Sequence, residues 1–284
     1  MDAKAKHINL FNRSVQQQSE RELESMEFNP GFDIRPQLET MSFEYGEGVF
    51  GPEVERRRLD DIRKSLRDKN ADGPEIPYVV AMDVGKTSDR DDLLSRNLLY
   101  GAMIYSAGKI GDEPVRSQGH VHAISPSCGS STPEVYEIWD GEAIIYMQET
   151  TNDNPGRCFA VHAQPGDVVV VPPAWAHYTV NANTSRPMLF GAWCVRDYGF
   201  DYTGVRSHGG LAWFPLVNDD GSLHWVPNDS YKTDGISQRE ARGFNEAGVS
   251  KGLPIYTQYE KDPELFSFVT RPEVIKDIWA NYEP

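Results

Sequence analysis

Gly119-His120-Val121-His122, with Glu134 and His177 farther along the chain, is the stretch of sequence that decides the fold. Successive side chains of a β-strand point to opposite faces, so His120 and His122 share one face. Three imidazoles and one carboxylate suit Fe(II), Mn, Zn or Ni. We therefore expect the three histidines and Glu134 to hold one divalent metal, with coordination positions left for water or substrate, as catalysis requires.

Glu134 competes with Glu137 for the position of the carboxylate ligand. The two residues are separated by an odd number, so in a strand they face opposite sides and only one of them can serve. Tyr136 lies two residues after Glu134 on the same face, where its hydroxyl could reach the ligand cavity. The alternation thus joins Tyr136 to whichever site Glu134 occupies.

The segment before His177 is a proline-rich turn, Val171-Pro172-Pro173-Ala174-Trp175-Ala176. It follows Val168–Val171, an apolar run that is typical of a strand buried on both faces. A tight turn at this place would fold the next strand back, so that His177 faces His120 and His122. The turn therefore predicts how the distant histidine reaches the other two.

Composition limits the classes of function that the chain can have. Its 284 residues carry a formal net charge of −15, which argues against nucleic acid and anionic membranes as partners. Cys128, Cys158 and Cys194 are far apart, so neither a disulfide scaffold nor a thiolate zinc site is expected. The N-terminus has no apolar run of signal-peptide length and no later segment reaches membrane-spanning length, so we expect a cytoplasmic protein.

Most of the middle of the chain consists of short β-prone runs separated by Gly, Pro, Asn or Asp. No ten-residue helical pattern interrupts them, which favours an antiparallel sandwich or barrel over a βαβ arrangement. The fold class is therefore mainly β. The predicted strands are 76–80, 98–104, 135–146, 159–162, 168–171, 177–180, 188–194 and the hairpin 213–217 with 222–226.

The two ends of the chain differ from this middle. Ser14–Met26 has a patchy helical pattern, and residues 29–51 read as extended loop. Pro52–Asp68 is predicted as a helix because Leu59, Ile62 and Leu66 recur at helical spacing, and Pro272–Ala280 as another. We divide the chain into an N-terminal arm and helix (1–75), a β-barrel (76–228) and a C-terminal extension (229–284).

Two sets of residues resemble the two motifs of the cupin family, in order and in spacing. The resemblance implies a jelly-roll-like β-barrel and selects Glu134 over Glu137, through the distance to Gly141. The sequence departs at Ala174, where the family usually has Gly, and in the longer insert Ala123–Pro133. The first set is Gly119, His120, His122, Glu134 and Gly141, and the second is Gly166, Pro172, His177 and Asn181.

A finer resemblance is to the archaeal-type, metal-dependent glucose-6-phosphate isomerases. It runs from about Pro52 to Asn228, and its most specific part is Val171–Asn181. It implies interconversion of glucose 6-phosphate and fructose 6-phosphate with one divalent metal per subunit, Fe(II) first and Mn, Zn or Ni as alternatives. It also implies that Glu134 acts as ligand and as base, whereas a hydride shift would leave it a ligand only. We expect a homodimer.

The same resemblance implies a phosphate-binding end of the cavity. Its binders would be Tyr78, Ser117 and the backbone of Gly119 and His120, because hydroxyls and N–H groups can hold a phosphate. Tyr202 is a further expected substrate-binding residue. The sequence departs from the family at Ala102, where a Thr is expected, and at Phe200, where a His is expected. These departures bear on the substrate and leave the metal ligands untouched.

Three other functions are compatible with this ligand set. The first is a cupin isomerase or epimerase of another phosphosugar, such as mannose 6-phosphate. The second is an Fe(II)-dependent dioxygenase, because three His and a Glu also suit O₂ chemistry. The third is a sugar-binding or storage cupin without turnover, against which the complete ligand set counts.

Overall fold

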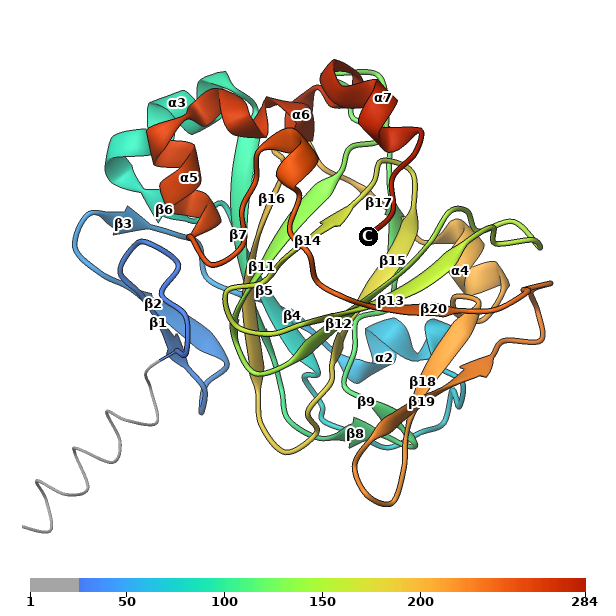
Figure 1. Ribbon diagram of the computed structural model, residues 1–284. Coiled ribbons are helices and arrows are strands. Elements are labelled where there is room, and N and C mark those ends of the chain that lie inside the picture. Colours follow the sequence, from blue (N-terminus) through green and yellow to red (C-terminus); the bar gives the residue numbers. More distant parts are fainter. Residues whose placement is uncertain (1–25) are drawn as a thin grey trace, which may run out of the picture.

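The computed structural model describes residues 26–284, and two six-stranded sheets form its centre (Figure 1). The mainly β class is confirmed, and the arrangement is a jelly-roll-like sandwich whose two sheets stay separate. Most of the predicted helix Ser14–Met26 lies outside the described residues. No helix in the described part of the chain is long and apolar enough to cross a membrane.

The first sheet carries the histidine strands. Its neighbours pair antiparallel except at one edge, where the last strand runs parallel to its neighbour. In order across the sheet, the strands are β17 (Phe200–Asp201), β10 (His120–His122), β15 (Ala176–Asn181), β12 (Ala143–Gln148), β13 (Cys158–Ala163) and β20 (Ser237–Glu240).

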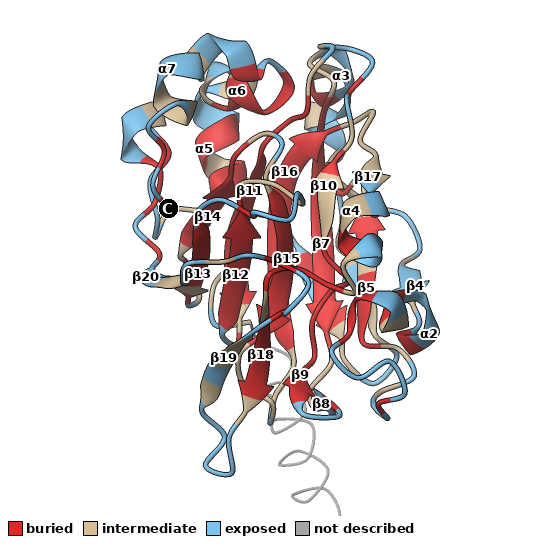
Figure 2. Ribbon diagram, turned by 90° about the vertical axis from the view of Figure 1, so that its right-hand side faces the viewer, coloured by how far each residue is buried: buried red, intermediate tan, exposed pale blue. Residues whose placement is uncertain are grey.

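The second sheet is antiparallel throughout and carries the strand of Glu134. Figure 2 shows that the central strands of both sheets are buried. In order across the sheet, the strands are β14 (Val168–Val171), β11 (Glu134–Asp140), β16 (Met188–Val195), β7 (Leu98–Tyr105), β5 (Tyr78–Met82) and β4 (Glu55–Arg57).

Shorter elements surround the two sheets. The two-stranded pairs are β1 (Ile34–Gln37) with β2 (Ser42–Tyr45), β3 (Val49–Phe50) with β6 (Gly85–Lys86), β8 (Lys109–Ile110) with β9 (Glu113–Pro114), and β18 (Trp213–Val217) with β19 (Leu223–Pro227). The α-helices are α2 (Leu59–Ile62), α3 (Arg90–Ser95), α4 (Thr203–Ser207), α5 (Ile255–Lys261), α6 (Ser267–Thr270) and α7 (Lys276–Trp279). Figure 1 shows α3, α5, α6 and α7 at one end of the sandwich and the pairs β8–β9 and β18–β19 at the other.

The predicted helix Pro52–Asp68 is wrong over its first half. Residues Glu55–Arg57 form the edge strand β4, and only α2 with the following 3₁₀ turn Arg63–Ser65 is helical. The helix begins late because the Asp61 carboxylate accepts the N–H of Arg58 at 2.9 Å, which caps the helix at that residue. Upstream of the cap the backbone gains more from pairing with β5 than from an isolated helical turn.

Two other flanking predictions also need correction. The loop expected at residues 29–51 contains the hairpin β1–β2, in which Ile34 is buried and pairs with Tyr45. The expected helix Pro272–Ala280 splits into the 3₁₀ turn Pro272–Ile275 and α7. The division of the chain at residues 75 and 228 stays a prediction, although β4 and β20 lie outside 76–228 and extend the two sheets.

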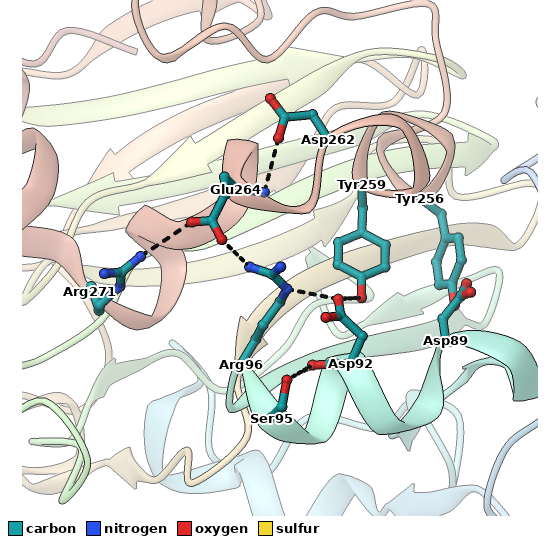
Figure 3. Close-up of polar contacts among 9 residues, drawn as sticks. All are labelled: Asp89, Asp92, Ser95, Arg96, Tyr256, Tyr259, Asp262, Glu264 and Arg271. Carbon is teal, nitrogen blue, oxygen red and sulfur yellow. Dashed lines mark hydrogen bonds and ion pairs between the residues drawn. The ribbon is translucent and has the colours of Figure 1, made fainter.

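The C-terminal segment is fastened to α3 by a polar network that Figure 3 shows. Arg96 lies between Asp92 and Glu264, at 2.7 Å and 2.6 Å. Tyr259 of α5 donates to the same Asp92 at 2.5 Å, and Tyr256 donates to Asp89 at 3.0 Å. The chain after the sandwich is thus bound back onto the end of the second sheet.

Candidate metal centre and substrate pocket

The four predicted ligands lie together in the structure. His120, His122, Glu134 and His177 each offer a ligand atom, and these atoms lie within 4.8 Å of one another. His120 of β10 pairs directly with His177 of β15, so both side chains point to the same face of the first sheet. The alternation argument for His120 and His122 therefore holds in three dimensions.

Glu134 reaches the cluster from the second sheet. It is the first residue of β11 and pairs with Val171, the last residue of β14. The turn Pro172–Trp175 then crosses from that sheet to β15, which carries His177. The cluster thus lies between the two sheets, where a single turn brings both motifs together.

Two backbone positions make this arrangement possible. Gly119 has φ of +86°, a conformation that glycine adopts readily, and a Cβ there would lie 3.3 Å from the carbonyl oxygen of His177. Ala174 has φ of +66°, which carries strain for a residue with a Cβ. The N–H of Ala174 donates to Ser131 Oγ at 2.9 Å, which helps to hold the turn where the cupin motif usually has Gly.

The histidine rings are oriented by backbone carbonyls. His122 Nδ1 lies 2.8 Å from the carbonyl oxygen of Thr132, and His177 Nδ1 lies 3.3 Å from that of Trp175. If Nδ1–H donates to these carbonyls, the Nε2 lone pairs are left for the centre of the cluster, as in many metal-binding histidines. Nε2 of His120 and of His177 are buried without a hydrogen-bond partner among the described residues. Unpaired buried nitrogens of this kind fit a metal ion that they would ligate.

Glu134 is ionised in this cluster. Burial alone would raise the pKa of its carboxyl, but the hydrogen bond with His122 and the imidazoles of His122 and His177 beside it outweigh burial and hold the pKa well below its ordinary value. Its Oε2 lies 3.1 Å from His122 Nε2 and accepts the Tyr136 hydroxyl at 2.7 Å. Burial lowers the pKa of His120 and of His177, which favours the neutral imidazole that a metal requires.

The residues expected to bind substrate line the same pocket as the ligands. The Ser117 hydroxyl oxygen accepts the N–H of Thr179 at 3.0 Å, so its hydrogen remains available to a ligand. Tyr78 stacks on Tyr105 with ring centroids 4.8 Å apart. The structure brings together Tyr78, Ser117, Gly119, His120, His122, Glu134, Tyr136, His177 and Tyr202.

The two departures from the family differ in their consequences. Ala102 is fully buried in the core and does not line the pocket, so the expected hydroxyl has no place there. Phe200 lines the pocket, and its ring lies 4.3 Å from that of His120. An apolar ring therefore covers one side of the metal cluster at the position where the family resemblance would place a histidine.

Several pocket residues escaped the sequence reasoning. Thr179 lies two residues after His177 in β15, so the same alternation that joined His120 to His122 could have found it. Arg57 belongs to the run Arg56-Arg57-Arg58, which could be an anion site but in the predicted helix reads as a solvated face, whereas it lies on strand β4. Gln118 and Tyr198 lie in irregular segments, for which no periodic pattern exists.

Glu137 lies on the opposite face of β11, as its odd separation from Glu134 predicts. It is completely buried and accepts the N–H of Ile255 at 2.7 Å and Trp139 Nε1 at 3.2 Å. Burial raises the pKa of Glu137 to about 8. This second glutamate anchors the start of α5 and takes no part in the metal cluster.

The insert Ala123–Pro133 is held in place by Asp197, which follows β16. The carboxylate of Asp197 accepts Ser125 Oγ at 2.8 Å and the N–H of Ser127 at 2.9 Å. The end of the same insert supplies the Thr132 carbonyl that orients His122. The long insert is therefore an ordered part of the support for one ligand.

Comparisons with known proteins identify the family of the chain. The family model described as Glucose-6-phosphate isomerase (GPI) matches residues 62–233, which is more than half of the chain. The glucose-6-phosphate isomerase of Thermococcus onnurineus (strain NA1) is 28% identical over 211 residues, 73% of this chain and 100% of that protein. The one from Pyrococcus abyssi (strain GE5 / Orsay) is 30% identical over 181 residues, 62% of this chain and 87% of that protein.

Solved structures show only weak overall similarity. An oxalate oxidase superposes with a TM-score of 0.35 at 11% identity, over 49% of this chain and 62% of that chain. Vicilin from Corylus avellana gives a TM-score of 0.33 at 10% identity, over 46% and 33% of the two chains. These values are too low to bear on the assignment, which follows from the family model. The chain belongs to the glucose-6-phosphate isomerase family.

Proposed function

We propose that the chain interconverts glucose 6-phosphate and fructose 6-phosphate in the pocket described above, with a divalent metal held by His120, His122, Glu134 and His177. The observation that carries this proposal is the pair of buried, unpaired Nε2 atoms of His120 and His177, beside the carboxylate of Glu134. They open into a pocket that also presents hydroxyl groups. Membership of the family suggests the reaction, and the side chains that line the pocket are of the kinds that this reaction requires.

A divalent metal in this cluster would act as a Lewis acid and stabilise the negative charge that develops on the two sugar oxygens during isomerisation. The ligand set suits Fe(II), our first choice, and also Mn, Zn and Ni. The residues of the chain have three further roles. They orient the sugar, hold its phosphate and move a proton between C1 and C2.

Glu134 is the proposed base. Its carboxylate is ionised, which is the form that accepts a proton. Oε2 accepts the Tyr136 hydroxyl and faces His122, whereas no hydrogen bond within residues 26–284 reaches Oε1. We propose that Oε1 takes the proton from C2 of the aldose and returns it to C1 through a cis-enediol.

Isotope exchange separates this route from a hydride shift. In D₂O, a proton held by Glu134 exchanges with solvent, so deuterium enters C1 or C2 of the product. A hydride that moves directly between the carbons carries no solvent deuterium. Proton NMR of the product at partial conversion measures the incorporation, and its absence would leave Glu134 as a ligand only.

The phosphate would bind at the far end of the pocket from Glu134. We propose Tyr78, Ser117 and Tyr202 as hydroxyl donors, with the backbone N–H groups of Gly119 and His120. Tyr136 is proposed as a catalytic group because its hydroxyl hydrogen-bonds the base directly. Its role is to hold Oε2 while Oε1 reacts.

One assay tests the whole proposal. Protein stripped with a chelator is reloaded separately with Fe(II), Mn(II), Zn(II) or Ni(II) and given fructose 6-phosphate, and glucose 6-phosphate is read by a coupled dehydrogenase. We expect turnover that depends on the metal. The His177→Ala variant should lose metal content and activity while its circular dichroism stays that of a β protein. Full activity of that variant in the presence of chelator would rule out the metal mechanism.

The alternatives are outcomes of the same experiment. Turnover of mannose 6-phosphate or a ketose phosphate, without turnover of fructose 6-phosphate, would favour another phosphosugar isomerase or epimerase. Oxygen uptake with an organic substrate would favour the Fe(II)-dependent dioxygenase. A cytoplasmic location and a homodimeric state stay predictions, and light scattering coupled to size-exclusion chromatography measures the second.

A further inference from the structure

We propose that Arg57 supplies the positive charge that makes this pocket select phosphorylated sugars. The proposal rests on the function proposed above and adds a specificity-determining residue to it. Arg57 is the last residue of the edge strand β4, outside the two histidine motifs. Its role follows from its register, its charge and its available donors.

The register of β4 places Arg57 beside the proposed phosphate binders. Arg57 pairs directly with Tyr78 of β5, and directly opposed residues of an antiparallel pair project from the same face. Tyr78 pairs in turn with Tyr105 of β7. All three side chains line the pocket. The row Arg57–Tyr78–Tyr105 therefore forms one wall of the pocket, with the guanidinium at the sheet edge.

The side chains of the pocket supply little positive charge for a phosphate. Among the described residues that line it, Arg57 is the single Lys or Arg side chain, and Glu134 contributes a negative charge. The chain as a whole carries a formal charge of −15. Hydroxyls and N–H groups can bind a phosphate, but they leave its negative charge uncompensated. A guanidinium provides that charge and a planar fork that matches two phosphate oxygens.

Arg57 is available for this role. One of its nitrogens, Nη2, pairs with Glu55 Oε2 at 2.8 Å, with side chains 33% and 58% exposed. Exposed pairs of this kind contribute little stability, so a phosphate can replace or share the contact. Burial raises the pKa of Tyr78 and of Tyr202, and the positive charge of Arg57 opposes that rise in both. The guanidinium therefore acts on the two tyrosines that we assign to the phosphate.

The neighbouring Arg56 is a matched control. It lies on the same strand and, by alternation, on the opposite face. Its Nη2 donates to the carbonyl oxygen of Thr40 at 2.9 Å, and it does not line the pocket. Arg56→Ala removes the same charge from the protein without removing it from the pocket.

The test compares Arg57→Ala, Arg57→Lys and Arg56→Ala in the metal-loaded protein. Loss of a charge-assisted contact should raise KM for fructose 6-phosphate about 10- to 100-fold in Arg57→Ala, with the smaller part of the loss in kcat. The inhibition constant of inorganic phosphate should rise in parallel. Arg57→Lys should recover part of the loss, because it keeps the charge and loses the fork. Arg56→Ala should behave as the wild type.

Calorimetric titration of fructose 6-phosphate separates this proposal from the proposed function. Wild-type protein that binds the phosphosugar but does not isomerise it would overturn the function alone, and Arg57→Ala would then be judged by its dissociation constant. Unchanged KM and dissociation constant in a folded Arg57→Ala variant would overturn the role of Arg57. If that variant does not fold, Arg57→Lys and Glu55→Gln decide the question. Glu55→Gln frees the guanidinium, so an increase in KM there would contradict the proposal.

Discussion

The two faces of β11 carry two buried glutamates with opposite properties. Glu134 is 8% exposed and Glu137 is fully buried, so burial hardly distinguishes them. Glu134 lies beside the imidazoles of His122 and His177 and is hydrogen-bonded to the first, and this environment outweighs burial, so the pKa of Glu134 falls well below the ordinary value. Glu137 has two neutral N–H donors and no cationic partner among residues 26–284, and burial raises its pKa to about 8.

The difference between the two faces shows what selects a functional carboxylate. The strand offers both residues the same backbone and nearly the same desolvation, so the partners from other elements decide. β10 and β15 bring histidines to one face, and α5 brings a backbone N–H to the other. One glutamate is available to a metal and a substrate, and the other holds the C-terminal segment in place.

The largest difference in kcat between the two faces is expected when each carboxyl is exchanged for an amide. Glu134→Gln removes the proposed base and a metal ligand, and we expect kcat to fall about 1000-fold or more. Glu137→Gln should leave kcat within about threefold, because it lies outside the pocket. Coupled isomerase assays measure both. Equal losses in the two variants would contradict the assignment of the faces.

The hydrogen-bond donors two residues downstream give a second, smaller contrast. Tyr136 donates to Glu134 at 2.7 Å, and Trp139 donates to Glu137 at 3.2 Å. Tyr136→Phe should lower kcat about 10- to 100-fold while metal content, read by elemental analysis, stays unchanged. Trp139→Phe should lower the free energy of unfolding by about 1–3 kcal/mol and spare kcat. A loss of stability without loss of kcat in Tyr136→Phe, or a loss of kcat in Trp139→Phe, would contradict this prediction.

The insert next to the metal face gives a still smaller effect. Asp197→Ala removes the carboxylate that holds Ser125 and Ser127, and so loosens the loop whose Thr132 carbonyl orients His122. We expect metal affinity to fall about tenfold, at the low end for groups that support a ligand. Competition with a chromophoric chelator measures the affinity.

Asp220 provides the control for that experiment. It holds Ser222 in the hairpin β18–β19 by a similar local contact, with the N–H of Ser222 at 2.9 Å. Asp220→Ala should leave metal affinity unchanged, because this hairpin lies away from the pocket. A loss of affinity in both variants would mean that general loosening of loops, and not the support of His122, is responsible.

The last prediction concerns the pH dependence of stability that the Glu137 carboxyl causes. It should have the smallest effect on turnover. The folded pKa of Glu137, about 8, lies above the ordinary value of 4.5, so the unfolded chain binds fewer protons between these values. Stability should therefore fall as pH rises through that window, by up to about 1.4 kcal/mol per pH unit from this group. Urea unfolding from pH 5 to 8 should show a shallower slope for Glu137→Gln. If the slope of Glu137→Gln equals that of the wild type, a group other than Glu137 causes the pH dependence.

The ligands could be predicted from the sequence because they lie in regular strands. Alternation fixes the face of His120, His122 and Glu134 without knowledge of the partner strands. The position of His177 followed from one tight turn between two strands. Local geometry was therefore sufficient for the metal cluster.

Arg57 could not be predicted in this way. Its segment contains Leu59, Ile62 and Leu66 at helical spacing. However, only α2 and the 3₁₀ turn that follows it are helical in the structure. What makes Glu55–Arg57 extended is the edge of β5, a partner distant in sequence. The hairpin β1–β2 and helix α5 were missed for the same reason, because tertiary packing stabilises short elements that have weak intrinsic preference.

The parallel strand β20 has a consequence for solubility. Without it, the first sheet would end at β13, whose Cys158–Ala163 run is mostly apolar and would expose unpaired backbone groups. Such edges invite pairing with other chains. β20 replaces this edge with Ser237-Gln238-Arg239-Glu240, which is polar and largely exposed. The segment that Glu137 and α3 hold in place therefore also protects the molecule against edge-to-edge aggregation.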